Sequence, residues 1–549
     1  MEATERNFDL EAARRFHDLT KHSYTSVRAG DHNLDWDNEP FKFKLYPQAS
    51  ALALPRELGL SQMRTLAALA RADAPGVPPA TLDLGRLARI LFCAAGLTRT
   101  KRAGGRDYHF RAAPSAGALY PIEVYLCAAA VDSLAQGLYH FCPADLKLRT
   151  LREGDWRAVV SRLCAGTVSI TRAGAVLLLS AIFWRSAWKY RARAYRYCFW
   201  DAGTMLANLA AAAAAEGIEA RVVTAFVDRE IEHLLGIDGE REGVVCLVLL
   251  NSSIDTQLPA RIPAERAPQT LAALSLESLP LSAQERTYDE LIRLHRASKL
   301  ASAAEVEQLC SARLEASSER YADSVEPAPS ASSAPGDLSD AESETNAPAT
   351  PAGAPATLRL EPGDVSEALG LGETILRRGS TRLFARKPIS ASALAHVLCA
   401  ASRRPRIDFP ALSDTYLIVN AVEGVEPGAY FYRREPASLE LLKAGELRAQ
   451  AGYLCLEQPL GADCSVLLCF MTDLERVLRT LGNRGYRGAH LEAGIRGGNA
   501  YLAAYALNLG ATGLTFYDDD TTEFFAPHGR EKRPLLMAAV GVPARAAPG

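Results

Sequence analysis

The sequence predicts an α+β protein built from two copies of one domain, because short motifs recur at a fixed offset and helices alternate with strands in each copy. GLYHF at Gly137–Phe141 matches GAYFY at Gly428–Tyr432 (428 − 137 = 291). RAYRYCFWDAG at Arg193–Gly203 matches RGYRGAHLEAG at Arg484–Gly494 (484 − 193 = 291). One offset held over about a hundred residues indicates an internal duplication.

Each copy is expected to contain the same elements in the same order. A helix rich in Leu and Ala comes first, followed by an apolar strand, a tyrosine-bearing turn and strand, a long buried helix and a final β run. Such an order favours a sheet covered by helices. The expected elements are Leu84–Gly96, Ile122–Ala129, Asp201–Glu216 and Val244–Leu250 in the first copy, and Ser392–Ser402, Thr415–Ala421, Leu491–Leu507 and Leu535–Val542 in the second.

A low-complexity segment separates the copies. Residues 326–357 hold one large apolar residue, Leu338, five acidic residues and no Lys or Arg. Such a segment cannot bury enough apolar surface to offset the entropy of ordering, so we expect a disordered linker. The predicted organisation is domain 1 over residues 1–260, a helical connecting arm over 261–325, the linker over 326–357 and domain 2 over 358–549.

Composition excludes several classes of protein. The 549 residues include 61 Lys plus Arg and 64 Asp plus Glu, for a net charge of -3, which gives no electrostatic basis for binding nucleic acid or an anionic membrane. No apolar run reaches the roughly 20 residues of a membrane-spanning helix, and the charged start is unlike a secretory signal, so we expect a cytoplasmic protein. We also expect no metal site, because the group His22, Asp31, His32, Asp35 and Asp37 lacks a ligand spacing.

Three segments carry a resemblance to a known family. RAAPSAGALYPIEVYL at Arg111–Leu126 and WKYRARAYRY at Trp188–Tyr197 resemble the nitroreductase superfamily, and within it the SagB-type (azoline dehydrogenase) branch. ILRRGSTRLF at Ile375–Phe384 is similar to the phosphate-binding start of ordinary nitroreductases. The resemblance implies two tandem nitroreductase-like domains, each a mixed sheet covered by helices. They would form an intramolecular pseudo-dimer around FMN, so the chain could act as a monomer.

The same resemblance implies a set of cofactor-binding residues. Small residues of the PSA segment would face the flavin ring, the arginine-rich segment would hold the phosphate, and the GLTFYDDD segment would lie at the flavin N5 edge. Arg545 matches a late cation of the phosphate site, although an ordinary exposed arginine near a terminus explains it equally well. The expected residues are Pro114, Ser115, Ala116, Gly117, Arg378, Ser380, Arg382, Leu514, Thr515 and Arg545.

The duplication predicts that only one of two possible flavin sites is intact. The offset of 291 places Ser115 on Arg406 and Gly117 on Asp408, so the second copy has lost the small residues that let backbone lie against a ring. In the earlier region Cys93 matches Cys399, an offset of 306, which places Arg378, Ser380 and Arg382 on Ala72, Ala74 and Gly76. The first copy therefore lacks the cations that a phosphate needs. We predict one FMN per chain; in the plainer interpretation RRGSTR is a solvated helix start and PSAGALYP a turn.

Lys189 and Tyr190 match the residues that the resembling family uses for proton transfer, and we predict them as the catalytic pair. Both side chains normally titrate near 10, so burial or a neighbouring cation must perturb one of them. Four arginines are close in sequence, although Lys189 could also be a surface cation and Tyr190 a packing residue. The arginines are Arg185, Arg191, Arg193 and Arg196, and further pocket candidates are Tyr120, Tyr195 and Asp201.

Three functions remain open at this point. The first is an FMN-dependent dehydrogenase of an azoline-type heterocycle, or of a similar C–N or C–C bond, in a peptide-derived natural product. The second is an NAD(P)H-dependent nitro or quinone reductase. The third is a non-catalytic scaffold subunit of a biosynthetic complex. The expected partners are accordingly a peptide or small-molecule substrate and biosynthetic partner proteins.

Overall fold

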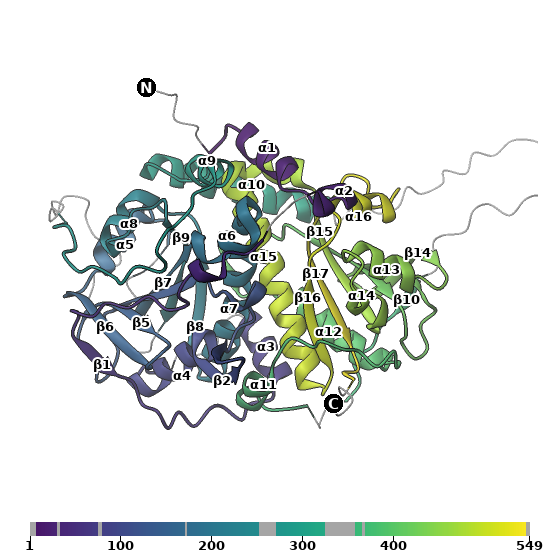
Figure 1. Cartoon of the computed structure of the whole chain (residues 1–549), viewed down its shortest axis with the longest axis horizontal. Helices are drawn as coiled ribbons and strands as arrows, with labels where there is room; N and C mark the ends of the chain where they lie inside the picture. Colours follow the sequence, from purple (N-terminus) through teal and green to yellow (C-terminus); the bar gives the residue numbers. More distant parts are fainter. Residues whose placement is uncertain are drawn as a thin grey trace, which may run out of the picture.

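Two sheets with the same strand order, each covered by helices, form the molecule (Figure 1). The computed structural model describes residues 7–29, 33–74, 80–168, 170, 173–251, 271–323, 357–364 and 368–544. The first sheet has the order β1-β6-β5-β4-β7-β9-β8-β11 and the second has the order β10-β14-β13-β12-β15-β17-β16. Apart from β11, the two orders correspond strand by strand. The predicted α+β fold in two tandem copies is confirmed.

The elements have the following bounds. The strands before the linker are β1 (Ala51–Ala53), β2 (Leu97–Ala103), β3 (Arg106–Arg111), β4 (Ile122–Ala128), β5 (Gly137–Cys142), β6 (Lys147–Glu153), β7 (Ala173–Ile182), β8 (Glu219–Val223) and β9 (Glu242–Asn251). Those after it are β10 (Thr357–Arg359), β11 (Arg406–Ile407), β12 (Asp414–Val419), β13 (Gly428–Arg433), β14 (Ser438–Ala444), β15 (Val466–Thr472), β16 (Gly510–Leu514) and β17 (Arg533–Gly541).

The α-helices are distributed over both halves and the arm between them. Those before the linker are α1 (Glu11–Leu19), α2 (Tyr24–Arg28), α3 (Thr65–Asp73), α4 (Leu84–Ala95), α5 (Arg157–Leu163), α6 (Phe183–Tyr190), α7 (Ala194–Ala215), α8 (Asp228–Leu235), α9 (Asp289–Ala297) and α10 (Ala303–Asp323). Those after it are α11 (Leu371–Arg377), α12 (Ala391–Ser402), α13 (Arg448–Leu454), α14 (Pro459–Asp463), α15 (Leu474–Ala506) and α16 (Asp518–Phe524).

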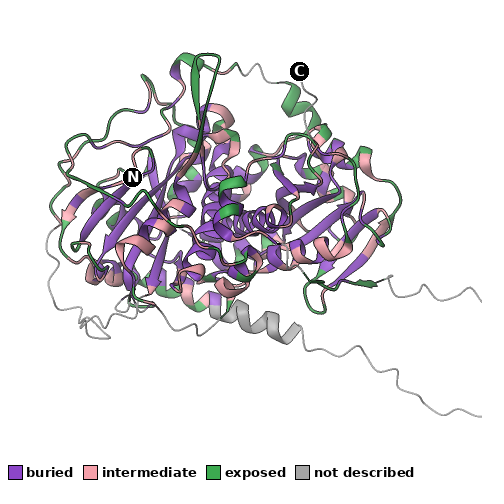
Figure 2. Ribbon diagram, turned by 90° about the horizontal axis from the view of Figure 1, so that it is seen from below, coloured by how far each residue is buried: buried purple, intermediate pink, exposed green. Residues whose placement is uncertain are grey.

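The two long helices α7 and α15 cross at the centre of the molecule, where nearly every residue is buried (Figure 2). Gly203 and Gly494, which are related by the offset of 291, lie at the crossing. A Cβ atom on Gly203 would lie 2.3 Å from the carbonyl oxygen of Leu491, and one on Gly494 would lie 2.4 Å from that of Trp200. The helix backbones therefore touch, and only glycine permits this approach.

Both long helices begin earlier than the sequence predicts. We expected starts at Asp201 and Leu491, whereas α7 begins at Ala194 and α15 at Leu474, with non-helical backbone at Gly482. The additional helical turns at the start of α7 and α15 are rich in arginine and tyrosine, so the sequence shows no clear apolar periodicity there. They are nevertheless buried, because their charges are paired across the contact between the domains.

Two matched ion-pair groups tie the domains together. In the first group Arg484 of α15 contacts both carboxylate oxygens of Asp228, with Nη1–O distances of 2.8 and 2.9 Å, and Arg487 contacts Oδ1 at 3.2 Å. Asp228 stands at the start of α8 in the other domain. With the offset of 291, Arg484 and Arg487 correspond to the two arginines of the second group, Arg193 and Arg196. That group consists of Arg193, Arg196 and Asp518.

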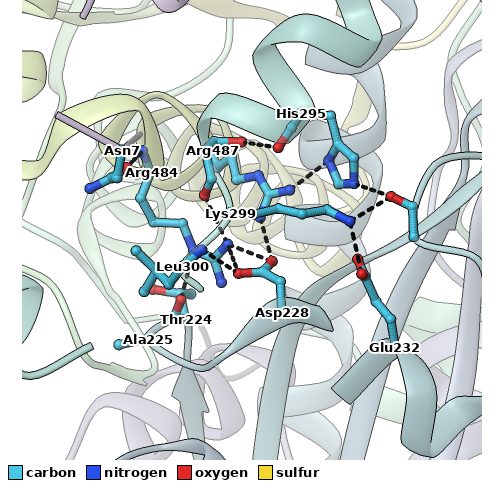
Figure 3. Close-up of polar contacts among 12 residues, drawn as sticks. Asn7, Thr224, Ala225, Asp228, Glu232, His295, Lys299, Leu300, Arg484 and Arg487 are labelled. Carbon is cyan, nitrogen blue, oxygen red and sulfur yellow. Dashed lines mark hydrogen bonds and ion pairs between the residues drawn. The ribbon is translucent and has the colours of Figure 1, made fainter. Parts of the chain in front are cut away.

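The connecting arm joins the first of these groups, as Figure 3 shows. His295 Nδ1 accepts a hydrogen bond from Arg487 Nη2 at 2.6 Å, and the backbone N–H of Leu300 donates to Asp228 Oδ2 at 2.8 Å. Lys299 forms an ion pair with Glu232 at 2.8 Å. The arm is thus part of the packed centre.

Two details correct the predicted boundaries. Thr357, which we assigned to the linker, begins β10, because it pairs with Glu440 of β14; residues 324–356 lie outside the described residues. In addition β11, from the second half of the chain, pairs in parallel with β8 and extends the first sheet. None of the helices within the described ranges has both the length and the apolar character needed to cross a membrane.

Candidate functional site

A cavity of about 1050 Å³ lies between the two domains and brings the predicted site residues together. Residues from both halves of the chain line it, including the catalytic pair and the PSA, RRGSTR and GLT segments. The predicted residues in its lining are Pro114, Ser115, Ala116, Gly117, Lys189, Tyr190, Arg378, Ser380, Arg382, Leu514 and Thr515. Arg545 lies outside the described residues, so its assignment stays a prediction.

The PSA turn forms one wall and is fixed from behind by Asp201 of α7. Ser115 Oγ donates to Asp201 Oδ2 at 2.6 Å, and the backbone N–H of Ala116 donates to Oδ1 at 3.0 Å. Burial raises the pKa of Asp201 to about 7, while the bonds from Ser115 and Ala116 favour the carboxylate. Gly117 has φ +64°, and a Cβ there would lie 2.9 Å from the hydroxyl of Tyr190. The turn therefore presents backbone and small side chains to the cavity.

The second domain also contributes small residues to the lining, beside the larger Tyr501 and Leu536. These small residues are Gly497 of α15, Gly513 of β16 and Ala538 of β17, and Leu514 and Thr515 belong to the same part of the lining. Small residues from both domains leave room for a planar group between them. The small residues on both sides are compatible with a flavin ring.

The RRGSTR segment brings cations to the same cavity, although its two arginines differ. Arg378 is buried, and its guanidinium donates to the carbonyl oxygens of Ala112 and Arg111, both at 2.7 Å. Arg382 is exposed at the cavity, and Ser380 Oγ lies 3.4 Å from the hydroxyl of Tyr501. Arg378 thus also stabilises the domain contact, whereas the polar groups of Arg382 and Ser380 line the cavity.

Lys189 and Tyr190 end α6 at the cavity, where burial shifts their pKa values in opposite directions. Burial lowers the pKa of the Lys189 ammonium, and the neighbouring Arg382 and Lys42 lower it further. Burial also raises the pKa of Tyr190 well above its usual value. Tyr190 stacks on Tyr197 with ring centroids 4.2 Å apart. The pair thus combines a lysine whose pKa is lowered with a tyrosine whose pKa is raised.

The cations near Lys189 are not those that its sequence neighbours suggest. Arg185 forms a buried ion pair with Glu123, and Arg193 and Arg196 bind Asp518 at the domain contact. These three arginines are therefore engaged in other ion pairs. The cations that lower the pKa of Lys189 are Arg382 and Lys42 instead. Of the three further candidates, Tyr120 and Asp201 line the cavity and Tyr195 does not; its hydroxyl accepts a hydrogen bond from Arg487 Nε at 2.8 Å.

The N-terminal segment holds α6 in place. Trp188 Nε1 donates to the carbonyl oxygen of Asp35 at 2.8 Å, and Arg185 Nε donates to that of Phe41 at 3.1 Å. The rings of Trp36 and Trp188 lie edge to face at 5.2 Å. The segment thus fixes the end of α6, where Lys189 and Tyr190 project into the cavity.

The pseudosymmetric position is filled by the chain itself. Asp408, which replaces Gly117 there, accepts hydrogen bonds from the backbone N–H groups of Thr224 at 2.7 Å and Ala225 at 3.0 Å. Thr224 corresponds to Thr515 (515 − 224 = 291). The Asp408 carboxylate therefore binds backbone N–H groups equivalent to those that begin at Thr515 in the open cavity. Arg313 of α10 pairs with Asp408 at 2.7 Å and neutralises it.

Little space remains at this second, pseudosymmetric position. β11, at the position of Ser115 and Ala116, is hydrogen-bonded to β8, whereas the PSA turn stands away from β16. A cavity of only about 20 Å³ is left, and Ala72, Ala74 and Arg406 belong to its lining. Gly76 lies outside the described residues.

The sequence prediction missed a hairpin, β2–β3, that reaches the cavity. Arg99, Lys101, Tyr108 and Phe110 of this hairpin belong to the cavity lining. A signal was available, because the offset between the copies falls from 306 at Cys93 to 291 at Gly137, so the first copy holds 15 additional residues (306 − 291 = 15). Tyr197 and Trp200 of α7 were also missed and have no comparable signal.

No group of three or more His, Cys, Asp or Glu side chains suited to a metal ion occurs among the described residues. Asp31 and His32, two of the five residues considered for a metal, lie outside them.

Comparison with known proteins places both halves of the chain in one family. The sequence profile of the Nitroreductase family matches residues 75–250 and 375–542. A protein of Methanocaldococcus jannaschii named "Putative nitroreductase MJ1384" is 30% identical over 195 residues, which cover 34% of this chain and 96% of that protein. The microcin B17-processing protein McbC of Escherichia coli is 28% identical over 130 residues, which cover 23% of this chain and 48% of McbC.

A solved structure shares the whole architecture. A crystal structure from Anabaena variabilis, described as a putative nitroreductase, superposes with a TM-score of 0.74 at 24% sequence identity. The match covers 97% of this chain and 99% of that one. A chain with both sheets is thus known in another protein, and at this identity the likeness shows the fold alone.

Proposed function

This chain belongs to the nitroreductase family, and on that premise we propose that it is an FMN-dependent oxidoreductase that dehydrogenates an azoline-type heterocycle in a peptide-derived natural product. Proteins of this family generally bind flavin. The single observation that carries the proposal is the interdomain cavity, in which Lys189 and Tyr190 face the PSA turn and the RRGSTR segment. The likeness to McbC, which is named for processing microcin B17, supports a peptide-derived substrate.

The cavity residues divide into those that would hold FMN and those that would act on substrate. Ser380, Arg382 and Arg378 would bind the phosphate, while the PSA turn and Gly513 would enclose the ring. When bound, flavin supplies a two-electron centre that accepts hydride at N5. Oxidation of an azoline also requires loss of a carbon-bound proton, and this proton needs a base.

Lys189 is the better base of the pair. Burial and the nearby cations favour its neutral amine, which can take the proton, whereas the raised pKa keeps the Tyr190 hydroxyl protonated. Tyr190 would then donate a hydrogen bond to the heterocycle, and its stacking on Tyr197 would fix the direction of that bond. Lys189 would take the proton and a bound flavin would accept the hydride, so that both hydrogens lost from the heterocycle have an acceptor.

Anaerobic mixing of the FMN-loaded protein with a thiazoline tests this function. We expect the flavin absorbance near 450 nm to bleach as the thiazole forms, because both electrons pass to the flavin. Bleaching by NADPH alone, with no reaction of the thiazoline, would instead identify a nitro or quinone reductase. A protein that binds no flavin would be a scaffold, and either result would overturn the proposal.

One FMN per 59.2 kDa chain is the expected stoichiometry, since Asp408 and β11 fill the second position. Arg382→Ala should release most of this FMN, because the variant loses a cation that faces the cavity. Arg377→Ala is the matched control, as Arg377 pairs with Glu373 at 3.1 Å instead of facing the cavity. FMN released by denaturation and measured by absorbance gives the ratio; two FMN per chain would contradict the prediction.

A further inference from the structure

The β2–β3 hairpin (Leu97–Arg111) presents a cationic and aromatic face to the cavity. In the hairpin register Arg99 pairs with Phe110 and Lys101 with Tyr108, and all four side chains line the cavity. The Arg99 guanidinium lies over the Phe110 ring at 4.6 Å. Cross-strand neighbours on one face act together, so this face offers two positive charges beside two aromatic rings.

On the other face of the same hairpin, the polar side chains pair with one another across the two strands. Arg102 pairs with Asp107, with an Nε–Oδ1 distance of 3.9 Å, and Thr100 Oγ1 lies 3.3 Å from His109 Nδ1. By contrast, no carboxylate of the described residues lies within ion-pair distance of Arg99 or Lys101. The inward cations are therefore available to a ligand.

The charge of the cavity exceeds what a flavin needs. Its lining holds five basic side chains, one of which, Lys189, we assign as the neutral base, and one carboxylate, Asp201, which accepts hydrogen bonds from Ser115 and Ala116. The RRGSTR segment already supplies cations for one phosphate. A second anionic group is thus expected in the cavity. The basic residues are Arg99, Lys101, Lys189, Arg378 and Arg382.

The hairpin occurs only beside the open cavity. The 15 residues by which the first copy exceeds the second equal the length of Leu97–Arg111. The second copy has no counterpart of these residues: its chain passes from α12 to β11, which lies at the closed position and matches Ser115 and Ala116. Of the two pseudosymmetric positions, the insertion therefore accompanies the one that holds the large cavity.

We propose that the hairpin is the substrate-recognition element of this site, and that Arg99 and Lys101 select a substrate with a carboxylate close to its reacting ring. The proposal rests on the azoline dehydrogenase function and names its substrate class. Arg99 and Lys101 bind the carboxylate, while Phe110 and Tyr108 pack against the flat, apolar part of the substrate.

Binding of a matched pair of thiazoles to the FMN-loaded protein tests the proposal without turnover. The probes are 2-phenylthiazole-4-carboxylate and its methylamide, and perturbation of the flavin absorption spectrum gives each Kd. We expect the carboxylate to bind at least about tenfold more tightly than the amide, the preference of a charge-assisted bond. Arg99→Ala/Lys101→Ala should abolish this preference and retain FMN, whereas Arg102→Ala, on the outward face, should preserve it.

Each other outcome has a definite meaning. Equal binding of the two thiazoles by the unmodified protein would overturn the proposal. Loss of FMN from Arg99→Ala/Lys101→Ala would assign these residues to the phosphate, and a weaker response to NADPH alone would assign them to a dinucleotide; both would overturn it. A carboxylate preference that depends on Arg99 and Lys101, with no oxidation of the corresponding thiazoline, would support the hairpin's role and refute the azoline dehydrogenase function.

Discussion

Lys189→Ala is expected to slow anaerobic reduction of the flavin by a thiazoline about 10²–10⁴-fold, the usual contribution of a positioned base. The variant should keep its FMN, because Lys189 contributes neither to the PSA wall nor to the RRGSTR segment. Stopped-flow bleaching of the flavin measures the effect. An unchanged rate would show that another group takes the proton.

Two controls separate proton removal from general damage to the site. Reoxidation of chemically reduced Lys189→Ala by dioxygen should match that of the unmodified protein, since this step requires no proton from carbon. Tyr190→Phe keeps the ring that stacks on Tyr197 and loses only the hydroxyl, so it should slow the thiazoline reaction less than Lys189→Ala does.

The same assignment fixes the direction of the pH dependence. Burial, Arg382 and Lys42 lower the pKa of Lys189 from its ordinary 10.5, so the neutral amine is present at lower pH than in water. The rate should rise with pH through the shifted pKa and then level off. Removing the charge of Lys42 should move the rising part of the pH–rate profile to higher pH, because one cause of the lowered Lys189 pKa is lost.

Much of the site could be predicted from sequence because the duplication supplies an internal comparison. Ser115 and Arg378 belong to motifs that are intact in one copy and lost in the other. This complementary loss indicates a shared cavity, and both residues line it. The elements of the fold were predictable for the same reason, since each apolar run occurs twice.

Interactions across the domain contact could not be predicted. The sequence shows only that Asp408 replaces a small residue, whereas in the structure Asp408 also fills the site by accepting hydrogen bonds from Thr224 and Ala225. Arg193 and Arg196 were expected near Lys189, but they are committed to Asp518, more than 320 residues away in sequence. Spacing along one chain carries no record of such long-range pairs.

The centre of the molecule gives the largest expected effect on stability. Asp228→Asn removes the carboxylate that faces Arg484 and Arg487 and leaves two buried guanidinium groups without a counter-charge. Breaking a buried pair in this way typically costs about 3–5 kcal/mol. The midpoint of urea unfolding should fall accordingly. Glu475→Ala, which breaks the exposed pair with Arg14, is the control and should cost at most about 1 kcal/mol.

The position of Asp228 also predicts where the damage spreads. Its carboxylate joins the first domain, the second domain through Arg484 and Arg487, and the arm through the backbone N–H of Leu300. Asp228→Asn should therefore increase hydrogen exchange at α9 and at the start of α15, while amides of β12 in the second sheet keep their protection. Because both domains build the cavity, the variant should also bind FMN more weakly. A variant with an unchanged unfolding midpoint would show that Arg484 and Arg487 find other partners, and that their ion pairs with Asp228 contribute little to holding the two domains together.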